Sequence, residues 1–255
     1  MSEIYTHEFF ETVGPPAERA AKVMAPMILE AFPARSIVDV GCGNGAWLAA
    51  FAELGVKDYL GIDGDYVQMS DLKIAPEKFM AWDLTKPAKL DRMFDLATSL
   101  EVAEHLPPES AAGFVESLCG LASTVIFSGA IPGQRGGNHL NEQWPPYWIE
   151  LFARNGYGVS DPFRKRVWGN KNVAFWYAQN LLVFKRGESA RNPADLEGFS
   201  IVHPELYKVA RGAEEYLRQY VDPETASFSR TVGMLPKTLA NAIKRRVGKK
   251  SGISD

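Results

Sequence analysis

A short apolar segment at residues 36–40 leads directly into a glycine-rich turn, with a carboxylate just ahead of the first glycine. The stretch reads IVDVGCGNGAW and contains Asp39, Gly41 and Gly43. A glycine-rich turn between a strand and a helix lets a ligand approach the backbone where a Cβ atom would collide, and it directs the free amides of the helix start at that ligand. The pattern therefore predicts a cofactor held close to the main chain.

Two kinds of cofactor use such a turn, and the glycines alone fit both. From Gly41 through Gly43 to Ala46 the turn matches the G-x-G-x-x-G/A fingerprint of dinucleotide-binding domains, with Asp63 placed for a ribose hydroxyl. Asp39 favours the second kind, because a carboxylate at the mouth of the loop suits the ammonium group of an amino-acid moiety and opposes a pyrophosphate. An NAD(P)-dependent oxidoreductase stays as an alternative, although the chain has no recognisable Tyr-x-x-x-Lys pair.

A second group of reactive side chains follows two later apolar runs. Glu101, Glu104 and His105 come after the run at 94–100, and His139 lies in a glycine-rich loop after the run at 124–130. Histidine titrates near neutrality, so His139 is the candidate base for an acceptor hydroxyl. A loop histidine that donates to a backbone carbonyl explains the same residue equally well.

The spacing of apolar residues predicts the elements that position these groups. Apolar runs at 36–40, 58–62, 79–82, 94–100 and 124–130 read as strands, and helix-like segments at 46–54 and 109–119 lie between some of them. Strands that alternate with helices indicate a parallel, doubly wound sheet. Helical spacing predicts a leading helix over 15–32, kinked or split at Pro26, and further helices at 145–155 and 204–220. The run at 172–185 reads as a strand that closes the sheet in an antiparallel pair.

Several motifs in this order resemble the class I S-adenosylmethionine-dependent methyltransferases. VDVGCGNG, YLGIDGD, AWDL and FDLATSLEVAEHL follow that family's order across residues 36–110, and the strand count continues the match to about residue 185. The resemblance implies an α/β fold with a mostly parallel seven-stranded sheet and an antiparallel last strand. It divides the chain into a helical lead-in at 1–35, an S-adenosylmethionine-binding core at 36–186, and a linker, helix and basic tail at 187–255.

The resemblance also implies roles for individual residues. Asp39 would hold the methionine part of S-adenosylmethionine together with the backbone of Gly41, Cys42 and Gly43. Asp63 and Gly64 would lie at the ribose, and Asp83 with Leu84 at the adenine. Ser99 and Glu101, at the end of the fourth strand, complete the expected cofactor contacts. Asp83 has a second interpretation as a solvated turn residue, because Asp often marks turns.

Glu101-x-x-Glu104-His105 also resembles a segment of ubiquinone-pathway O-methyltransferases and of the enzymes that methylate small-RNA 3′ ends. In those enzymes the segment can bind a divalent metal that fixes a diol. The implied metal set here is Glu101, Glu104 and His105, which His139 could complete. In the metal-free alternative, Glu104 and His105 only orient the loop after the fourth strand, and His139 acts alone.

Aromatic residues gather around the same loop in the sequence. The group comprises Trp144, Tyr147, Trp148, Trp168, Trp176 and Tyr177, with nearby amides at Asn138, Asn141, Gln143 and Asn172. Because sugars stack on aromatic faces, this group favours O-methylation of a saccharide or lipid-linked glycan hydroxyl. The same segment resembles a bacterial branch of the superfamily that is associated with polysaccharide assembly, which supports this prediction. The alternatives are aromatic residues that belong to the core, a small-molecule O-methyltransferase with a divalent metal, and a cofactor-binding module without activity.

Composition restricts the partners. The 255 residues carry a net charge of −3, which gives no broad basic face for nucleic acid, and the two cysteines form no disulfide or zinc pattern. With no signal sequence or membrane span in the pattern, we expect a cytoplasmic protein. Residues 235–250 combine an apolar stripe with six basic residues, which predicts either peripheral contact with anionic lipid at the inner face of the membrane or a solvated basic end.

Overall fold

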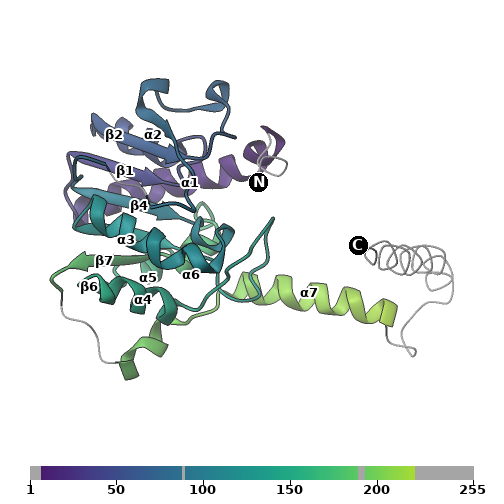
Figure 1. Ribbon diagram of the computed structural model, residues 1–255. Helices are drawn as coiled ribbons and strands as arrows, with labels where there is room; N and C mark the ends of the chain where they lie inside the picture. Colours follow the sequence, from purple (N-terminus) through teal and green to yellow (C-terminus); the bar gives the residue numbers. More distant parts are fainter. Residues whose placement is uncertain (1–6, 88–89, 189–192, 222–255) are drawn as a thin grey trace, which may run out of the picture. The chain divides into compact units, whose positions relative to one another are not determined.

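A single seven-stranded sheet organises the chain (Figure 1). The computed structural model describes residues 7–87, 90–188 and 193–221, and it divides into two compact units, Met1–Leu206 and Tyr207–Asp255. The strands are β1 (Ser36–Val40), β2 (Asp58–Asp63), β3 (Phe79–Ala81), β4 (Leu96–Leu100), β5 (Thr124–Ser128), β6 (Tyr157–Ser160) and β7 (Leu182–Arg186). Their order in the sheet is β3-β2-β1-β4-β5-β7-β6.

The strand directions confirm the fold class that the sequence predicts. Strands β1 to β5 pair in parallel, whereas β7 pairs antiparallel with both β5 and β6. The α-helices are α1 (His7–Ala31), α2 (Ala46–Glu53), α3 (Ala111–Leu121), α4 (Pro145–Arg154), α5 (Arg164–Val167), α6 (Phe175–Asn180) and α7 (Pro204–Val221). The 3₁₀ turns are η1 (Met69–Asp71), η2 (Pro76–Lys78), η3 (Ala103–His105), η4 (Pro108–Ser110) and η5 (Pro193–Phe199).

Each face of the sheet is covered by its own group of helices. Alternate residues of a strand point to opposite faces, so Ile37 of β1 joins one hydrophobic cluster while Val38 and Val40 join the other. The first cluster contains residues of α1, α2, α5 and α6, and the second contains residues of α3 and α4. The helices on both sides make this a doubly wound architecture.

The sequence predicts a kink or a split at Pro26, and the split is wrong, because α1 continues through this residue. A proline in a helix leaves the carbonyl four residues earlier without its partner. Here both Pro26 and Lys22, the residue that carries that carbonyl, are exposed, so water can solvate the group. Buried Met24 and Ile28 on either side anchor the helix to the sheet. Tertiary packing therefore maintains the helix across the proline.

The predicted strand at 172–185 is also wrong in its first half. Only Leu182–Arg186 pairs in the sheet, as the expected antiparallel strand, and Phe175–Asn180 forms α6. The helix places Tyr177 and Ala178 against the core and gives Gln179 and Asn180 buried polar partners. Contacts with the rest of the fold outweigh the β preference of an aromatic, apolar run.

Two further expectations concern the remaining parts of the chain. The helix predicted at 204–220 is present as α7. The basic amphipathic segment at 235–250 lies outside the described residues. Among the helices that the structure describes, none combines the length and apolar character needed to cross a bilayer.

Candidate functional site

The predicted site residues lie at or after the carboxyl ends of β1, β2, β3, β4 and β5. Strands β1 and β4 are neighbours, but the chain leaves β1 toward β2 on one side and leaves β4 toward β5 on the other. Such a reversal opens a crevice at the carboxyl edge, where ligands of open α/β sheets bind.

The loop after β1 needs glycine for both conformation and space. Gly41 has a φ of 84°, and a Cβ added to it would lie 2.3 Å from Val102 Cγ2. The amides of Gly41 and Cys42 donate to the carbonyl of Ile62, and that of Gly43 donates to Asp63 Oδ2 at 2.6 Å. These three amides are therefore occupied by the protein. A ligand ammonium group would meet the Asp39 carboxylate and loop carbonyls instead of these donors.

Asp39 is a buried carboxylate at this crevice. Thr98 Oγ1 donates to Asp39 Oδ1 at 2.6 Å, and only 2% of the Asp39 surface is exposed. Burial raises the pKa of Asp39 to about 7; the Thr98 hydrogen bond opposes this shift, and the Asp63 charge adds to it. A cationic partner would stabilise the ionised form. The electrostatics therefore suit the ammonium group that the sequence predicts at this position.

Asp63, at the end of β2, is a second buried carboxylate. Its Oδ1 accepts from the Gly64 amide at 2.7 Å and from the Tyr66 hydroxyl, and its Oδ2 accepts from Gly43. Burial raises its pKa against these three donors. A carboxylate offers about four lone-pair positions, so one remains for a ligand hydroxyl beside the protein donors. Tyr66 already supplies a hydroxyl of the kind that a ribose would supply.

Asp83 and Leu84 lie differently from the carboxylates above. Asp83 is exposed; its Oδ1 accepts from the amide and the hydroxyl of Thr85, and Lys86 lies 3.2 Å from its Oδ2. These bonds hold the pKa of Asp83 below its usual range. This geometry agrees with the second interpretation of Asp83, a solvated turn residue. Leu84 is buried, and the adenine role of the pair stays a prediction.

Glu104, His105 and His139 come together although 34 residues separate the last two. One potential ligand atom from each lies within 4.8 Å of the others, and the two imidazole rings pack edge to face with centroids 4.8 Å apart. Glu104 and His105 lie on η3 after β4, and His139 lies on the loop after β5, whose Leu140 and Asn141 amides donate to the Glu104 carbonyl. The parallel pairing of β4 and β5 thus brings the three together.

The Glu104 carboxylate is the least satisfied polar group of this cluster. Within the described residues, neither of its oxygens makes a hydrogen bond of normal geometry, and only 1% of its surface is exposed. Burial and the neighbouring Glu101 raise its pKa far above the usual range. Burial and the His139 charge lower the pKa of His105 to about 4, so this imidazole is neutral at pH 7. A buried carboxylate beside two imidazoles is a donor set suited to Zn²⁺ or Mn²⁺.

His139 is held by the loop in which it lies. Its Nδ1 lies 2.8 Å from Glu142 Oε1, and Glu142 also accepts from the amides of Gly133 and Arg135. Because Nδ1 faces a carboxylate, it carries the proton, and Nε2 remains able to accept a proton or to ligate a cation. Glu142 therefore orients His139 and selects its tautomer.

Glu101 and Ser99 do not join this cluster of potential ligands. Glu101 has a φ of 57° and directs its carboxylate at the amides of Asn180 and Gln134. Ser99 is completely buried in β4, and its hydroxyl has no hydrogen-bond partner among the described residues. Their cofactor roles stay predictions, and Glu101 lies next to the potential ligands rather than among them.

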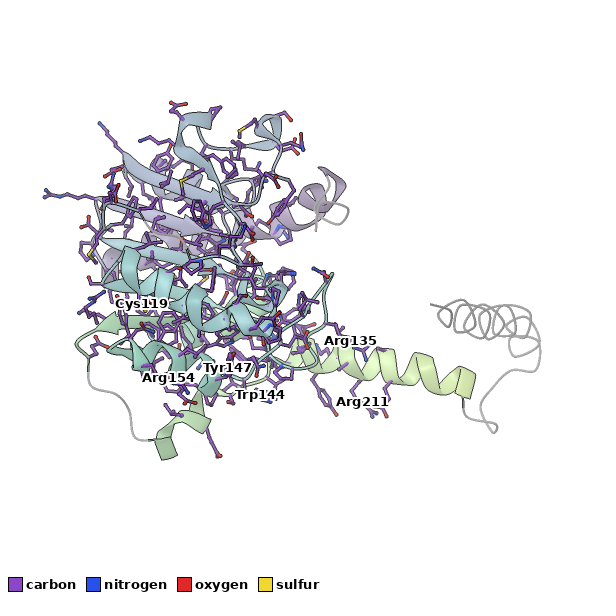
Figure 2. All side chains as sticks on the ribbon, in the orientation of Figure 1. Cys119, Arg135, Trp144, Tyr147, Arg154 and Arg211 are labelled. Carbon is purple, nitrogen blue, oxygen red and sulfur yellow. The ribbon has the colours of Figure 1, made fainter. Side chains whose placement is uncertain are left out.

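The aromatic group predicted from the sequence is divided by the sheet. Trp148 packs on Phe127 with ring centroids 5.2 Å apart and belongs to one hydrophobic cluster, whereas Trp176 and Tyr177 pack with the other. Trp144 is 42% exposed and precedes α4, next to the half-buried Tyr147 (Figure 2). Trp144 and Tyr147 are the members of the group that directly follow the His139 loop in the chain and keep exposed surface, whereas Trp168 packs on the His203 ring.

Sequence reasoning missed the residues that support these groups. Thr98 contacts Asp39, Tyr66 contacts Asp63, and the amides of Gln134, Gln179 and Asn180 lie behind Glu101. One signal was present: the polar pair Gln179-Asn180 interrupts the apolar run at 172–185. Two adjacent amides in a buried segment indicate a polar network.

Comparison with known proteins gives consistent findings. Residues 15–126 match the model of a family described as a methyltransferase domain. The sugar N-methyltransferase KedS8 from Streptoalloteichus sp ATCC 53650 is similar in structure, with a TM-score of 0.53, 17% identity, and coverage of 71% of this chain and 92% of that chain. The methyltransferase domain of bacterial CtHen1-C has a TM-score of 0.51 and 18% identity, over 67% of this chain and 99% of that one. DesVI of Streptomyces venezuelae has a TM-score of 0.51 and 16% identity, over 72% and 97%. No curated protein gives a significant match.

Proposed function

We propose that this chain is a class I S-adenosylmethionine-dependent methyltransferase that methylates a hydroxyl oxygen of a saccharide or lipid-linked glycan, which the match of residues 15–126 to a methyltransferase-domain family supports. The observation that carries the proposal is the convergence of Glu104, His105 and His139 at the carboxyl edge of the sheet. Along the same edge lie Asp39 on β1, which is next to β4, and Asp63 on β2, one strand further, the carboxylates suited to the co-substrate. Methyl donor and acceptor would thus meet between β1 and the loops after β4 and β5.

An oxygen acceptor is favoured because this edge offers groups that can take a proton from a hydroxyl. Methyl transfer to oxygen needs the acceptor held in line with the sulfonium and its proton removed. His139 Nε2 is the available proton acceptor, with Glu142 holding the ring from the other side. Trp144 and Tyr147 provide ring surface for a sugar face beside that loop.

The same three residues fit a divalent cation, and we include one in the proposal. The fit rests on the Glu104 carboxylate, whose oxygens make no hydrogen bond of normal geometry within the described residues; a buried carboxylate in such surroundings is costly unless it is protonated or paired with a positive charge. A divalent cation there would polarise the acceptor hydroxyl and lower its pKa. Glu104, His105 and His139 would hold the cation, and Glu142 would keep His139 turned toward it.

The second candidate is a cation-free reaction in which His139 alone acts as the base. It is favoured by the Nδ1 contact with Glu142, which fixes the ring with Nε2 turned away from that carboxylate. The two candidates differ in what removal of metal does to the enzyme.

Mn²⁺ binding separates these two candidates. We expect the purified chain to bind one Mn²⁺, and Glu104→Gln to weaken this binding about 10²-fold, because the substitution removes the only charged ligand of the three. Electron paramagnetic resonance of free Mn²⁺ measures the binding. Glu109→Gln, an exposed carboxylate just beyond η3, is the control and should bind like the parent. Turnover that is insensitive to EDTA, with no Mn²⁺ bound, would instead favour His139 as the sole base.

The acceptor class is tested by methyl transfer to whole-cell material. We expect label from methyl-labelled S-adenosylmethionine to appear in the soluble-sugar or lipid-linked pool of an extract that is separated into protein, nucleic-acid, lipid-linked and sugar fractions. His139→Ala should remove that label whichever candidate holds. Label in protein or RNA would contradict the saccharide acceptor, and co-substrate binding with no labelled pool would favour a binding module without activity.

A further inference from the structure

Three buried side-chain amides next to the candidate site hydrogen-bond to one another and form a small network. Gln134 comes from the loop after β5, and Gln179 and Asn180 come from the end of α6; all three are at least nine-tenths buried. Gln179 Nε2 donates to Asn180 Oδ1 at 2.9 Å and to Gln134 Oε1 at 3.2 Å, and Asn180 Nδ2 donates to Gln134 Oε1 at 2.8 Å. Each amide is thus oriented by the other two.

Two amides of this network also donate to the carboxylate of Glu101. Asn180 Nδ2 lies 3.0 Å from Glu101 Oε1 and 3.3 Å from Oε2, and Gln134 Nε2 donates to Oε2 at 2.8 Å. The Glu101 amide in turn donates to Ser128 Oγ at 3.1 Å. A non-glycine residue with a φ of 57° is held in an uncommon conformation, which persists only where surrounding contacts determine it. Both the backbone and the carboxylate of Glu101 are therefore fixed in place.

The third amide of the network, that of Gln179, connects it to residues 199–203. Gln179 Oε1 accepts from the His203 amide at 2.7 Å. The buried Arg164 guanidinium donates from Nη1 to the Gln179 carbonyl at 2.9 Å and to the Phe199 carbonyl at 2.8 Å. The segment that follows β7 thus helps to fix the orientation of the amides that contact Glu101.

A network of this kind exceeds what the fold itself requires. Buried amides contribute little net stability compared with apolar residues of the same size, because their desolvation offsets their hydrogen bonds. The carboxylate of the network is Glu101, which lies beside Glu104 at the carboxyl edge of β4, whereas Arg164 lies at the far end of the network. The network therefore has its main effect on where that carboxylate lies.

We propose that Asn180, supported by Gln134 and Gln179, is a positioning residue of the transferase: it fixes the Glu101 carboxylate beside Glu104, next to the cation that Glu104, His105 and His139 would hold. This inference rests on the proposed function, because it assigns Asn180 a role in the same cation site. Asn180 acts through Glu101 and touches neither the acceptor nor the co-substrate.

The test compares Asn180→Leu with a control that loses an amide elsewhere. Leucine keeps the size of asparagine but cannot donate, so Glu101 loses its Asn180 bonds, and we expect Mn²⁺ affinity to fall about 10- to 100-fold, as is typical when a partner of a metal-site group is lost. S-adenosylhomocysteine affinity should change less than about twofold, since Asp39 and Asp63 are untouched. Asn155→Leu removes a half-buried amide that donates only to the Leu151 carbonyl at the end of α4, and it should leave Mn²⁺ affinity unchanged.

A double-mutant cycle shows whether Asn180 acts through Glu101. In a Glu101→Gln background, Asn180→Leu should weaken Mn²⁺ binding by less than about twofold further, because the charge to be positioned is already gone. Parental Mn²⁺ affinity in Asn180→Leu, or a full additional loss in the Glu101→Gln background, would overturn the role of Asn180 alone. Absence of Mn²⁺ binding by the unmodified chain would overturn the cation site and this inference with it.

Discussion

Replacing Asp39 with asparagine will weaken S-adenosylmethionine binding by about 10- to 100-fold at pH 8 while raising the melting temperature of the ligand-free protein. The affinity falls because a charge-assisted contact with the ammonium group contributes about 1.5–3 kcal/mol. The stability rises because asparagine keeps an oxygen for the Thr98 hydroxyl without burying a charge. Isothermal titration calorimetry and thermal unfolding on the same samples measure the two effects.

The sign of the stability change follows from the pKa of Asp39. Burial raises this pKa from 3.8 to about 7 in the folded chain, so the native state binds more protons than the unfolded state between those values. Stability therefore falls as the pH rises through about 4 to 7, by up to about 4 kcal/mol from this group. At pH 8 Asp39→Asn avoids that loss, which corresponds to a melting temperature higher by up to about 8–16 °C for a domain of this size.

The pH dependence of binding gives an independent check on Asp39. In the parent protein, affinity for the cationic co-substrate should fall about tenfold per pH unit as the pH drops below about 7, because the free carboxylate protonates. Asp39→Asn should lack this dependence. Asp65→Asn, an exposed carboxylate at the same edge of the sheet, is the matched control for charge. Unchanged affinity in Asp39→Asn would show that the methionine part binds elsewhere.

The placement of the predicted cofactor residues at adjoining strand ends could be derived from the sequence because its determinants are local. The run at 36–40, the glycines after it and the acidic residue ending the next strand lie within 28 residues, and their order alone places them at adjoining strand ends. Glycine at 41 is required by a positive φ and by the close approach of Val102. Short-range pattern and backbone geometry agree here, so the sequence is informative.

The support of the acceptor half could not be predicted because it depends on distant contacts. Asn180 and Glu101 are 79 residues apart in the sequence. They meet because the connection between β6 and β7 folds as α5 and α6, which pack on the face of the sheet formed by β1 and β4. An apolar run with aromatic residues is typical of a strand, but the periodicity of so short a segment cannot distinguish a strand from a buried helix. The polar pair at 179–180 is the only local sign of the true arrangement.

The aromatic residues lie close together along the chain but on opposite faces of the sheet, so the predicted aromatic group does not form. Trp148 and Tyr177 occur within 30 residues of each other in a stretch rich in aromatic residues. The sheet lies between them, because α4 packs on one face and α6 on the other. Which face a helix covers is set by the connection between strands, and the sequence carries little record of it.

Replacing Gly136 with alanine should lower turnover about 10²-fold, although Gly136 carries no reactive group. A Cβ added at this position would lie 2.1 Å from His139 Nε2 and 2.5 Å from its Cε1, so the imidazole must move. Glu142 holds Nδ1 from the other side, and the ring cannot move without losing that contact. A displacement of about 1 Å in a catalytic group can cost about 10²-fold in rate.

The adjacent glycine provides the control for this substitution. A Cβ added to Gly137 meets nothing within 4 Å, and neither glycine has a positive φ, so Gly137→Ala should keep parental turnover. Both glycines are exposed, so neither variant should change the melting temperature by more than about 2 °C. In a His139→Ala background, Gly136→Ala should have no further effect, because the ring that it displaces is absent. Equal turnover in the two alanine variants would mean that the position of His139 does not matter to the reaction, which would contradict its role both as base and as cation ligand.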